Sequence, residues 1–146
     1  MVARELMTQN PKTCAPDHDL ACSIRIMKEE NCGIVPVTEG NGESRVVGVV
    51  TDRDIALHLG SQNAKPSDVR VRDVMSTDIV SVSPEDDIKE VTRKMEDAQV
   101  RRVLVVEGGT LRGVISTADL ARESARSGKA RMEKEVGRVM ERVSEP

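Results

Sequence analysis

Residues 46–55 read VVGVVTDRDI, and residues 112–120 read RGVISTADL. In both stretches a run rich in β-branched residues leads to a threonine or serine that an aspartate follows three positions later. A β-branched run predicts a strand, and the Ser/Thr-x-x-Asp spacing is typical of a helix N-terminus. Each stretch therefore predicts a strand that runs directly into a helix, which begins at Thr51 in one case and at Ser116 in the other.

The two stretches belong to a tandem repeat. At an offset of 68 residues, the segment 4–8 (RELMT) aligns with 72–76 (RDVMS), and further identities join 16–39 to 84–107. After a loop that is three residues longer in the first copy, the offset becomes 65, and the closing strand and helix align. Self-similarity of this kind is the sequence signature of a repeat architecture.

Each copy predicts the element order β-α-β-β-α. A short helix or turn near residues 4–7 leads to an extended segment around 12–15, and Ser83-Pro84 offers a helix start in the second copy. Apolar residues at helical spacing predict the next helix, at Leu20, Ile24 and Met27 in the first copy and at Ile88, Val91 and Met95 in the second. Strands are predicted at 34–37, 45–50, 103–106 and 111–115, with turns at Gly40-Asn41-Gly42 and Gly108-Gly109.

The predicted fold class is α+β (α/β), with two β-α-β-β-α repeats packed about a pseudo-twofold axis. Because a repeat of this size is marginally stable alone, we expect the two repeats to share one core. The expected boundaries are repeat 1 at 1–60, a linker at 61–70, repeat 2 at 71–126 and a charged C-terminal helix or tail at 127–146. In the tail, apolar positions from Met132 to Val143 fall on one helical face.

The composition excludes several classes of protein. Of 146 residues, 38% are apolar, and 22 basic residues stand against 25 acidic ones, which leaves a net charge of −3. No apolar run can span a bilayer, and the N-terminus has no apolar signal core, so we expect a cytoplasmic protein without membrane contact. The chain has no Phe, Tyr or Trp. Nucleic acid is disfavoured as a partner, because both a basic field and stacking platforms are missing.

The cysteines and histidines predict neither a metal site nor catalysis. Cys14, Cys22 and Cys32 are odd in number and form no CxxC motif, and His18 and His58 show no metal-ligand spacing with them. We expect the cysteines to be small buried residues in a reducing compartment. No Ser/His/Asp or Cys/His/Asn grouping is visible, so the sequence predicts no enzyme and no required cofactor.

The repeat resembles a known family. The openings 5–8 and 73–76, the stretch 100–106 and the two closing stretches quoted above are similar to the motifs of cystathionine-β-synthase (CBS) domains, in the right order and in both copies. The resemblance covers about residues 2 to 125. It implies a CBS pair, or Bateman module, that stands alone without an attached enzyme or transporter.

The two strand-to-helix junctions are the candidate site. Unpaired N–H groups at a helix N-terminus attract phosphate. Thr51 or Ser116 adds a hydroxyl, and the carboxylate of Asp54 or Asp119 could accept both hydroxyls of a ribose. The same residues form ordinary helix caps, and spacing alone favours that interpretation. The resemblance favours binding, because family members use this Ser/Thr and Asp to hold the ribose and phosphate of adenosine ligands.

Further candidate residues follow from the resemblance. Arg101 and Arg102 lie where a helix leads into a buried strand, and basic side chains at matching positions of nucleotide-binding CBS pairs contact phosphates. The first copy departs from this pattern with Gly33 and Ile34. Cys32 and Gly33 would line the Ser116/Asp119 pocket. Alternatively, Arg101 and Arg102 are exposed, with the stems of their side chains over apolar surface. Arg53 either reaches a phosphate or pairs with Asp52 or a neighbour.

We therefore expect an adenosine-nucleotide-binding regulatory or sensor module without catalysis, whose ligand is AMP, ADP, ATP or S-adenosylmethionine. Because both arginines come from one copy, we expect the Ser116/Asp119 cleft to bind more tightly than the Thr51/Asp54 cleft. The alternative is a ligand-free interaction or scaffold protein that acts through its helices and the stripe in its C-terminal tail. The protein target is unknown. Apolar helix residues in excess of one core, such as Ile24, Met27, Ile88 and Met95, predict a homodimer.

Overall fold

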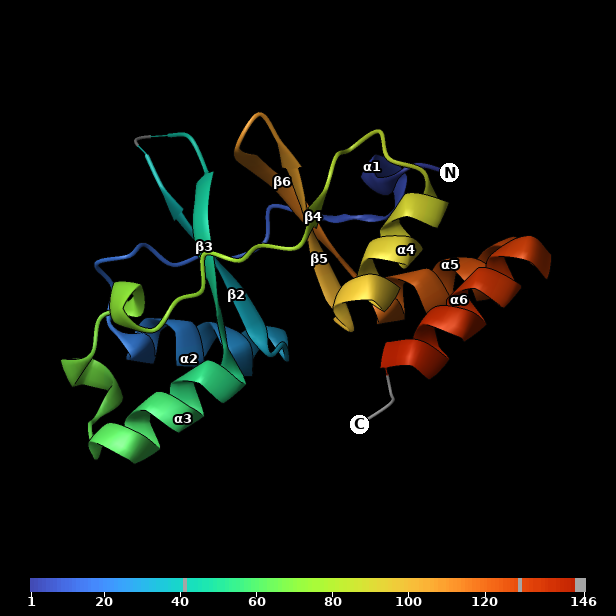
Figure 1. Ribbon diagram of the computed structural model, residues 1–146. Helices are drawn as coiled ribbons and strands as arrows, with labels where there is room; N and C mark the ends of the chain where they lie inside the picture. The colour runs from blue at the N-terminus through green and yellow to red at the C-terminus, as the bar shows by residue number, and fades with distance from the viewer. Residues whose placement is uncertain (41, 129, 144–146) are drawn as a thin grey trace. The chain divides into compact units, whose positions relative to one another are not determined.

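The computed structural model describes residues 1–40, 42–128 and 130–143, apart from the side chains of 130 and 131. Residue 41 of the predicted turn and residues 129 and 144–146 of the predicted tail lie outside the described residues. The chain forms two compact units (Figure 1). One comprises residues 12–79, and the other combines residues 1–11 with residues 80–146. None of the described helices combines the length and the apolar character needed to cross a membrane.

The 12–79 unit is built on a hairpin. Strand β2 (Ile34–Glu39) pairs antiparallel with β3 (Arg45–Thr51), and Cys14 forms a parallel bridge to Val37 beside them. Helix α2 (Leu20–Glu30) precedes the hairpin and α3 (Asp52–Gln62) follows it, before two 3-10 turns, η1 (Pro66–Asp68) and η2 (Val71–Asp73). Helix α2 starts at Asp19, whose side chain accepts a hydrogen bond from the Cys22 amide. The predicted element order is confirmed in the first copy.

The 1–11/80–146 unit repeats this plan. Strand β4 (Ser81–Val82) pairs parallel with β5 (Arg102–Glu107), which pairs antiparallel with β6 (Thr110–Ser116). Helix α4 (Ile88–Ala98) lies between β4 and β5 in sequence, and α5 (Thr117–Ser127) follows β6. The unit also contains α1 (Ala3–Leu6), β1 (Thr8–Gln9) and α6 (Ala130–Val143), and β1 pairs antiparallel with β6. The α+β class and the β-α-β-β-α element order are thus confirmed.

The two repeats exchange their opening segments. The segment that opens the first repeat packs in the unit of the second, where the amides of Ala3 and Arg4 donate to the carbonyls of Asp86 and Pro84 at 2.8 and 2.9 Å. The same pattern recurs in the other unit. There the amides of Val71 and Arg72 donate to the carbonyls of His18 and Pro16 at 2.8 and 3.0 Å.

Ion pairs and close backbone contacts accompany the exchange. Arg4 pairs with Glu85, and Arg72 pairs with Asp17, which is the aligned position. Each exchanged segment also passes directly over a glycine. A Cβ atom on Gly113 would lie 2.7 Å from the Thr8 carbonyl oxygen, and one on Gly48 would lie 2.8 Å from that of Ser76. The repeated glycine is therefore explained by the close approach of backbone to backbone.

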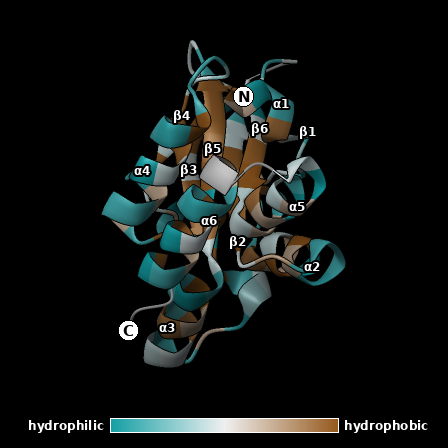
Figure 2. Cartoon of the chain, turned by 90° about the vertical axis from the view of Figure 1, so that its right-hand side faces the viewer, coloured by the Kyte–Doolittle hydropathy of each residue, from teal (hydrophilic) through white to brown (hydrophobic). Residues whose placement is uncertain are grey.

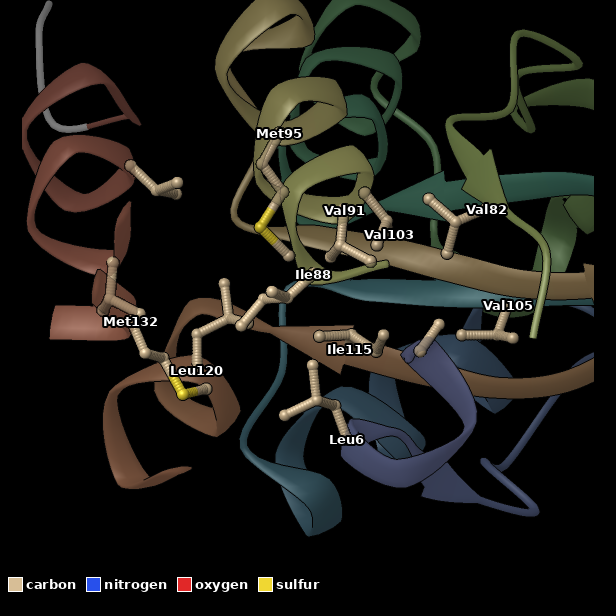
Figure 3. Packing of buried hydrophobic residues seen from close by; sticks show 13 residues of the cluster. Leu6, Val82, Ile88, Val91, Met95, Val103, Val105, Ile115, Leu120 and Met132 are labelled. Atoms are coloured by element: carbon tan, nitrogen blue, oxygen red, sulfur yellow. The ribbon is translucent and has the colours of Figure 1, made fainter. Parts of the chain in front are cut away.

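The buried apolar residues form two clusters rather than the single shared core that we expected. Each cluster draws its residues from one unit only, so the exchange gives each repeat the extra apolar surface that it lacks alone. In the 1–11/80–146 unit, side chains from α1, α4, β5, β6, α5 and α6 meet (Figure 3). The second cluster contains Cys14, Leu20, Met27, Val35, Val37, Val50, Ile55, Val69 and Val71.

Helix α6 uses its apolar stripe inside its own unit. It packs on α4 and α5 (Figures 1 and 2), where Met132, Val136 and Val139 are 5%, 6% and 0% exposed. The alternative function that gave this stripe to a partner protein is therefore wrong in its choice of surface, because the stripe completes a core. Of the four apolar residues offered for dimerisation, Met27, Ile88 and Met95 are buried in the same way, and only Ile24 is exposed.

Candidate functional site

The strand-to-helix junctions form as predicted. At the end of β3, the Thr51 hydroxyl accepts a hydrogen bond from the Asp54 amide at 3.1 Å and so caps α3. At the end of β6, the Ser116 hydroxyl accepts from the Asp119 amide at 3.2 Å and caps α5. Each helix thus presents its N-terminal amides and positive dipole end directly after a strand.

The two aspartates of these junctions differ in their bonding. The Asp119 carboxylate accepts from the Ser116 amide at 2.8 Å and from the Ser116 hydroxyl at 3.0 Å, and it pairs with Arg122. This is the closed capping box that spacing alone favoured. Among the described residues, none donates a hydrogen bond to the Asp54 carboxylate, which is half-buried. Asp54 is therefore free to accept a ligand, whereas Asp119 must first give up bonds within the protein.

The arginines lie beside the second junction. Arg102 begins β5 and stands directly opposite Ser116 in the antiparallel register, so the two side chains share one face of the ladder. Arg101 is exposed, and its carbonyl accepts from the Thr117 amide at 2.9 Å. In the described part of the chain, neither guanidinium pairs with a carboxylate. The positions that align with them hold Gly33 and Ile34, so an apolar residue, Ile34, stands opposite Thr51 in the register.

Arg53 and Asp52 lie on the first turn of α3. Both side chains are exposed, and the Asp52 carboxylate accepts from the Arg53 amide at 2.8 Å. The Arg53–Asp52 ion pair that the sequence left open is absent from the described residues. Arg53 therefore remains available at this helix N-terminus.

Cys32 and Gly33 follow α2, which ends at Asn31 in the left-handed conformation. The Gly33 carbonyl accepts from the Asp52 amide at 3.0 Å, and a Cβ on Gly33 would lie 3.0 Å from an Asp52 carboxylate oxygen. These two residues therefore adjoin the Thr51 junction of their own unit. Their role at the Ser116/Asp119 pocket stays a prediction.

Cavities occur at other places that sequence reasoning missed. One of about 460 Å³ in the 12–79 unit is lined by Pro16, Glu39 and Arg72, and one of about 410 Å³ in the other unit is lined by the aligned Pro84, Glu107 and Arg4. The two cavities occupy equivalent places because the exchanged segments form one wall of each. The signal in the sequence that could have revealed these cavities is the Arg, Pro and Glu that recur at aligned positions of the two copies. Another cavity, of about 320 Å³, is lined in part by Asp119.

Three metal-ligating side chains also come together in the 12–79 unit. The ligand atoms of Cys14, His18 and Cys22 all lie within 4.8 Å of one another, and the cysteines are free thiols. Burial raises the pKa of the Cys14 thiol to about 12, and its hydrogen bond with Cys22 acts in the same direction. Spacing along the chain did not reveal this group, because its members come from a bridge residue, a turn and a helix.

Comparison with known proteins places these junctions in a family. A family model described as "CBS domain" matches residues 3–61 and 71–126. The chain belongs to the CBS-domain family. It is 32% identical over 118 residues to the CBS domain-containing protein YhcV of Bacillus subtilis, with 81% of each chain covered.

Solved structures agree. The crystal structure of hypoxic response protein I with two coordinated zinc ions is 26% identical at a TM-score of 0.74, with 84% of this chain and 98% of that chain covered. The structure of the AcuB protein of Vibrio cholerae has a TM-score of 0.78 and covers 91% of this chain and 96% of that one. At 24% identity, it shows the fold alone. Together the matches support a regulatory module of the CBS type.

Proposed function

We propose that this CBS pair is an adenosine-nucleotide-binding regulatory module that carries out no chemistry of its own. The observation that carries the proposal is the junction of β6 and α5, where Arg102 stands opposite the capping Ser116. A guanidinium without a carboxylate partner, a hydroxyl and the amides of a helix N-terminus together suit a phosphate group.

The junction of β3 and α3 supports the ribose part of the proposal. The Asp54 carboxylate lies one helical turn from Thr51 and has no donor among the described residues. A vicinal diol offers two donors, and a carboxylate has lone pairs for both. Because the chain has no aromatic residue, adenine must lie between aliphatic side chains and be recognised by backbone groups. We expect micromolar affinity, about −8 kcal/mol.

The two junctions should rank ligands differently. Phosphate-bearing ligands should prefer the Ser116/Asp119 junction, because a charge-assisted hydrogen bond contributes about 1.5–3 kcal/mol. Adenosine lacks that phosphate, and its ribose should prefer Asp54, whose carboxylate accepts no hydrogen bond from the described residues, whereas that of Asp119 accepts two from Ser116.

Isothermal titration with AMP, ADP, ATP, S-adenosylmethionine and adenosine tests the proposal. We expect saturable binding of at least one of them and a loss of binding in Asp54→Ala or Arg102→Ala. If none of the five gives heat or a thermal shift, the proposal is wrong. The homodimer belongs to the same proposal, and a monomer mass by light scattering at about 50 μM protein would overturn it.

A further inference from the structure

The thiols of Cys14 and Cys22 and the imidazole of His18 converge at one edge of the 12–79 unit. Cys14 bridges to β2, His18 lies in the turn before α2, and Cys22 lies in the first turn of α2. The two sulfur atoms are 3.4 Å apart, and the Cys22 sulfur lies 3.5 Å from His18 Nδ1. We propose that Cys14, His18 and Cys22 bind a Zn²⁺ ion.

These distances match the edges of a tetrahedral zinc site. Zn–S bonds of about 2.3 Å and Zn–N bonds of about 2.0–2.1 Å put two sulfurs about 3.8 Å apart and a sulfur and a nitrogen about 3.5 Å apart. The two sulfurs need to separate by only a few tenths of an ångström to accept the ion. The Cys14 sulfur and His18 Nδ1, which lie within 4.8 Å of each other, must also come to about 3.5 Å. A disulfide would instead require them to approach to about 2.05 Å, which is a movement of more than an ångström.

The donor set selects the metal. Two thiolates and an imidazole suit Zn²⁺, whereas Ca²⁺ and Mg²⁺ prefer oxygen ligands. The carboxylate of Asp19, which caps α2, is engaged by the Cys22 amide at 3.2 Å. The fourth position would therefore be filled by water, as in sites with three protein ligands. Cys14 is buried and His18 is exposed, so the ion can enter from the His18 side.

Repeat symmetry separates metal binding from ordinary turn capping. His18 Nδ1 accepts from the Ala15 amide at 3.0 Å, and at the aligned position Asp86 accepts from the Ser83 amide at 2.8 Å. Capping alone thus accounts for an acceptor at residue 18. It does not account for two thiols beside that acceptor, since the second repeat has Val82 and Glu90 at those positions. A bound ion would take the Nδ1 lone pair from the Ala15 amide and so replace one hydrogen bond.

The ion would join three parts of the unit. The Cys14 amide donates to Pro36 at 3.1 Å and its carbonyl accepts from Thr38 at 2.9 Å, which ties it to β2. Cys22 belongs to α2, and the His18 carbonyl accepts from Val71 of the exchanged segment. Zinc should therefore stabilise the 12–79 unit and hold the turn on which the exchanged segment rests.

Cobalt is the first probe, added to the reduced, metal-free full chain. We expect one equivalent of Co²⁺ to give a thiolate-to-cobalt charge-transfer band that Zn²⁺ abolishes. Zn²⁺ at about a hundredfold excess over its Kd should raise the thermal midpoint by at least about 5 °C.

Two variants remove ligands from the site. Cys14→Val copies the aligned residue of the second repeat, and His18→Asn keeps an acceptor for the Ala15 amide without supplying a carboxylate that could itself bind the ion, so both should fold. Each should weaken Co²⁺ binding by at least about tenfold, whereas Cys32→Ala should bind Co²⁺ like the unchanged protein.

Three results would overturn the proposal. One is the absence of a charge-transfer band in the reduced protein. Another is a band that appears with unchanged Co²⁺ affinity in both Cys14→Val and His18→Asn, or one that Cys32→Ala removes. The third is a Cys14–Cys22 disulfide in the purified protein whose reduction restores no metal binding, which would make the pair a redox couple instead.

Discussion

A methyl group added at Gly113 should dislodge the exchanged N-terminal segment. Gly113 lies in β6 opposite Gln9 of β1, and a Cβ there would lie 2.7 Å from the Thr8 carbonyl oxygen and 2.8 Å from the Met7 sulfur. Met7 can rotate away, but the Thr8 carbonyl belongs to the backbone of β1. The strand pair must therefore separate.

The magnitude follows from two opposing effects. Overpacking typically costs about 1–3 kcal/mol. Replacing glycine by alanine where φ is not positive returns about 0.4–1 kcal/mol by restricting the unfolded chain. We expect a net loss of about 1–2 kcal/mol in the free energy of unfolding for Gly113→Ala. At about 2–4 °C per kcal/mol for a chain of nearly 150 residues, the thermal midpoint should fall by about 2–8 °C.

Circular dichroism melts and urea titrations of three variants measure this. Gly48→Ala should behave like Gly113→Ala, because its Cβ would lie 2.8 Å from the Ser76 carbonyl oxygen. Gly137→Ala is the matched control, since no described atom lies within 4 Å of its Cβ position, and it should stabilise α6 by up to about 1 kcal/mol. If Gly113→Ala melts at or above the temperature of the unchanged protein, the argument from close approach is wrong.

Three further outcomes follow from the junctions and the buried thiol. Asp119→Ala should lower the free energy of unfolding by about 1 kcal/mol in urea titrations, because it opens a closed capping box. Asp54→Ala should leave the free energy of unfolding nearly unchanged. Equal losses in the two variants would contradict the difference in bonding between the two carboxylates. In isothermal titration, Arg101→Ala combined with Arg102→Ala should lower the affinity for AMP roughly tenfold to a hundredfold but hardly change the affinity for adenosine. Equal losses for both ligands would mean that the arginines support the fold. Cys14 is 1% exposed and has a pKa of about 12, so mass spectrometry should show that it is alkylated at least about tenfold more slowly than Cys32 at neutral pH. The difference in rate should shrink as rising pH forms the Cys14 thiolate. Equal rates would refute the burial of Cys14.

The candidate site shows how far sequence reasoning reached. Thr51 and Ser116 were identified as helix starts from a spacing of three residues, and both cap a helix. The same spacing could not distinguish Asp54 from Asp119. That difference depends on where each carboxylate turns and on Arg122, which reaches Asp119 from the next turn of α5.

Prediction failed where packing, rather than local periodicity, brings side chains together. The spacing of Cys14, His18 and Cys22 resembles no metal motif, because the strand bridge at Cys14 and the start of α2 bring them together. The alternative function predicted from the sequence gave the apolar stripe of α6 to a partner. Only its packing on α4 and α5 decided for the core.

By itself, the sequence determined the duplication, the order of the elements and the two strand-to-helix junctions. Those features depend on local periodicity and capping, which neighbouring residues set. The tertiary structure alone decided that each repeat completes the core of the other with its opening segment. The aligned segments 4–8 and 72–76 could pack on either repeat with the same local conformation. Their places are set by backbone hydrogen bonds to Pro84 and Pro16 and by contacts over Gly113 and Gly48, which join residues about 28 to 105 positions apart in the chain.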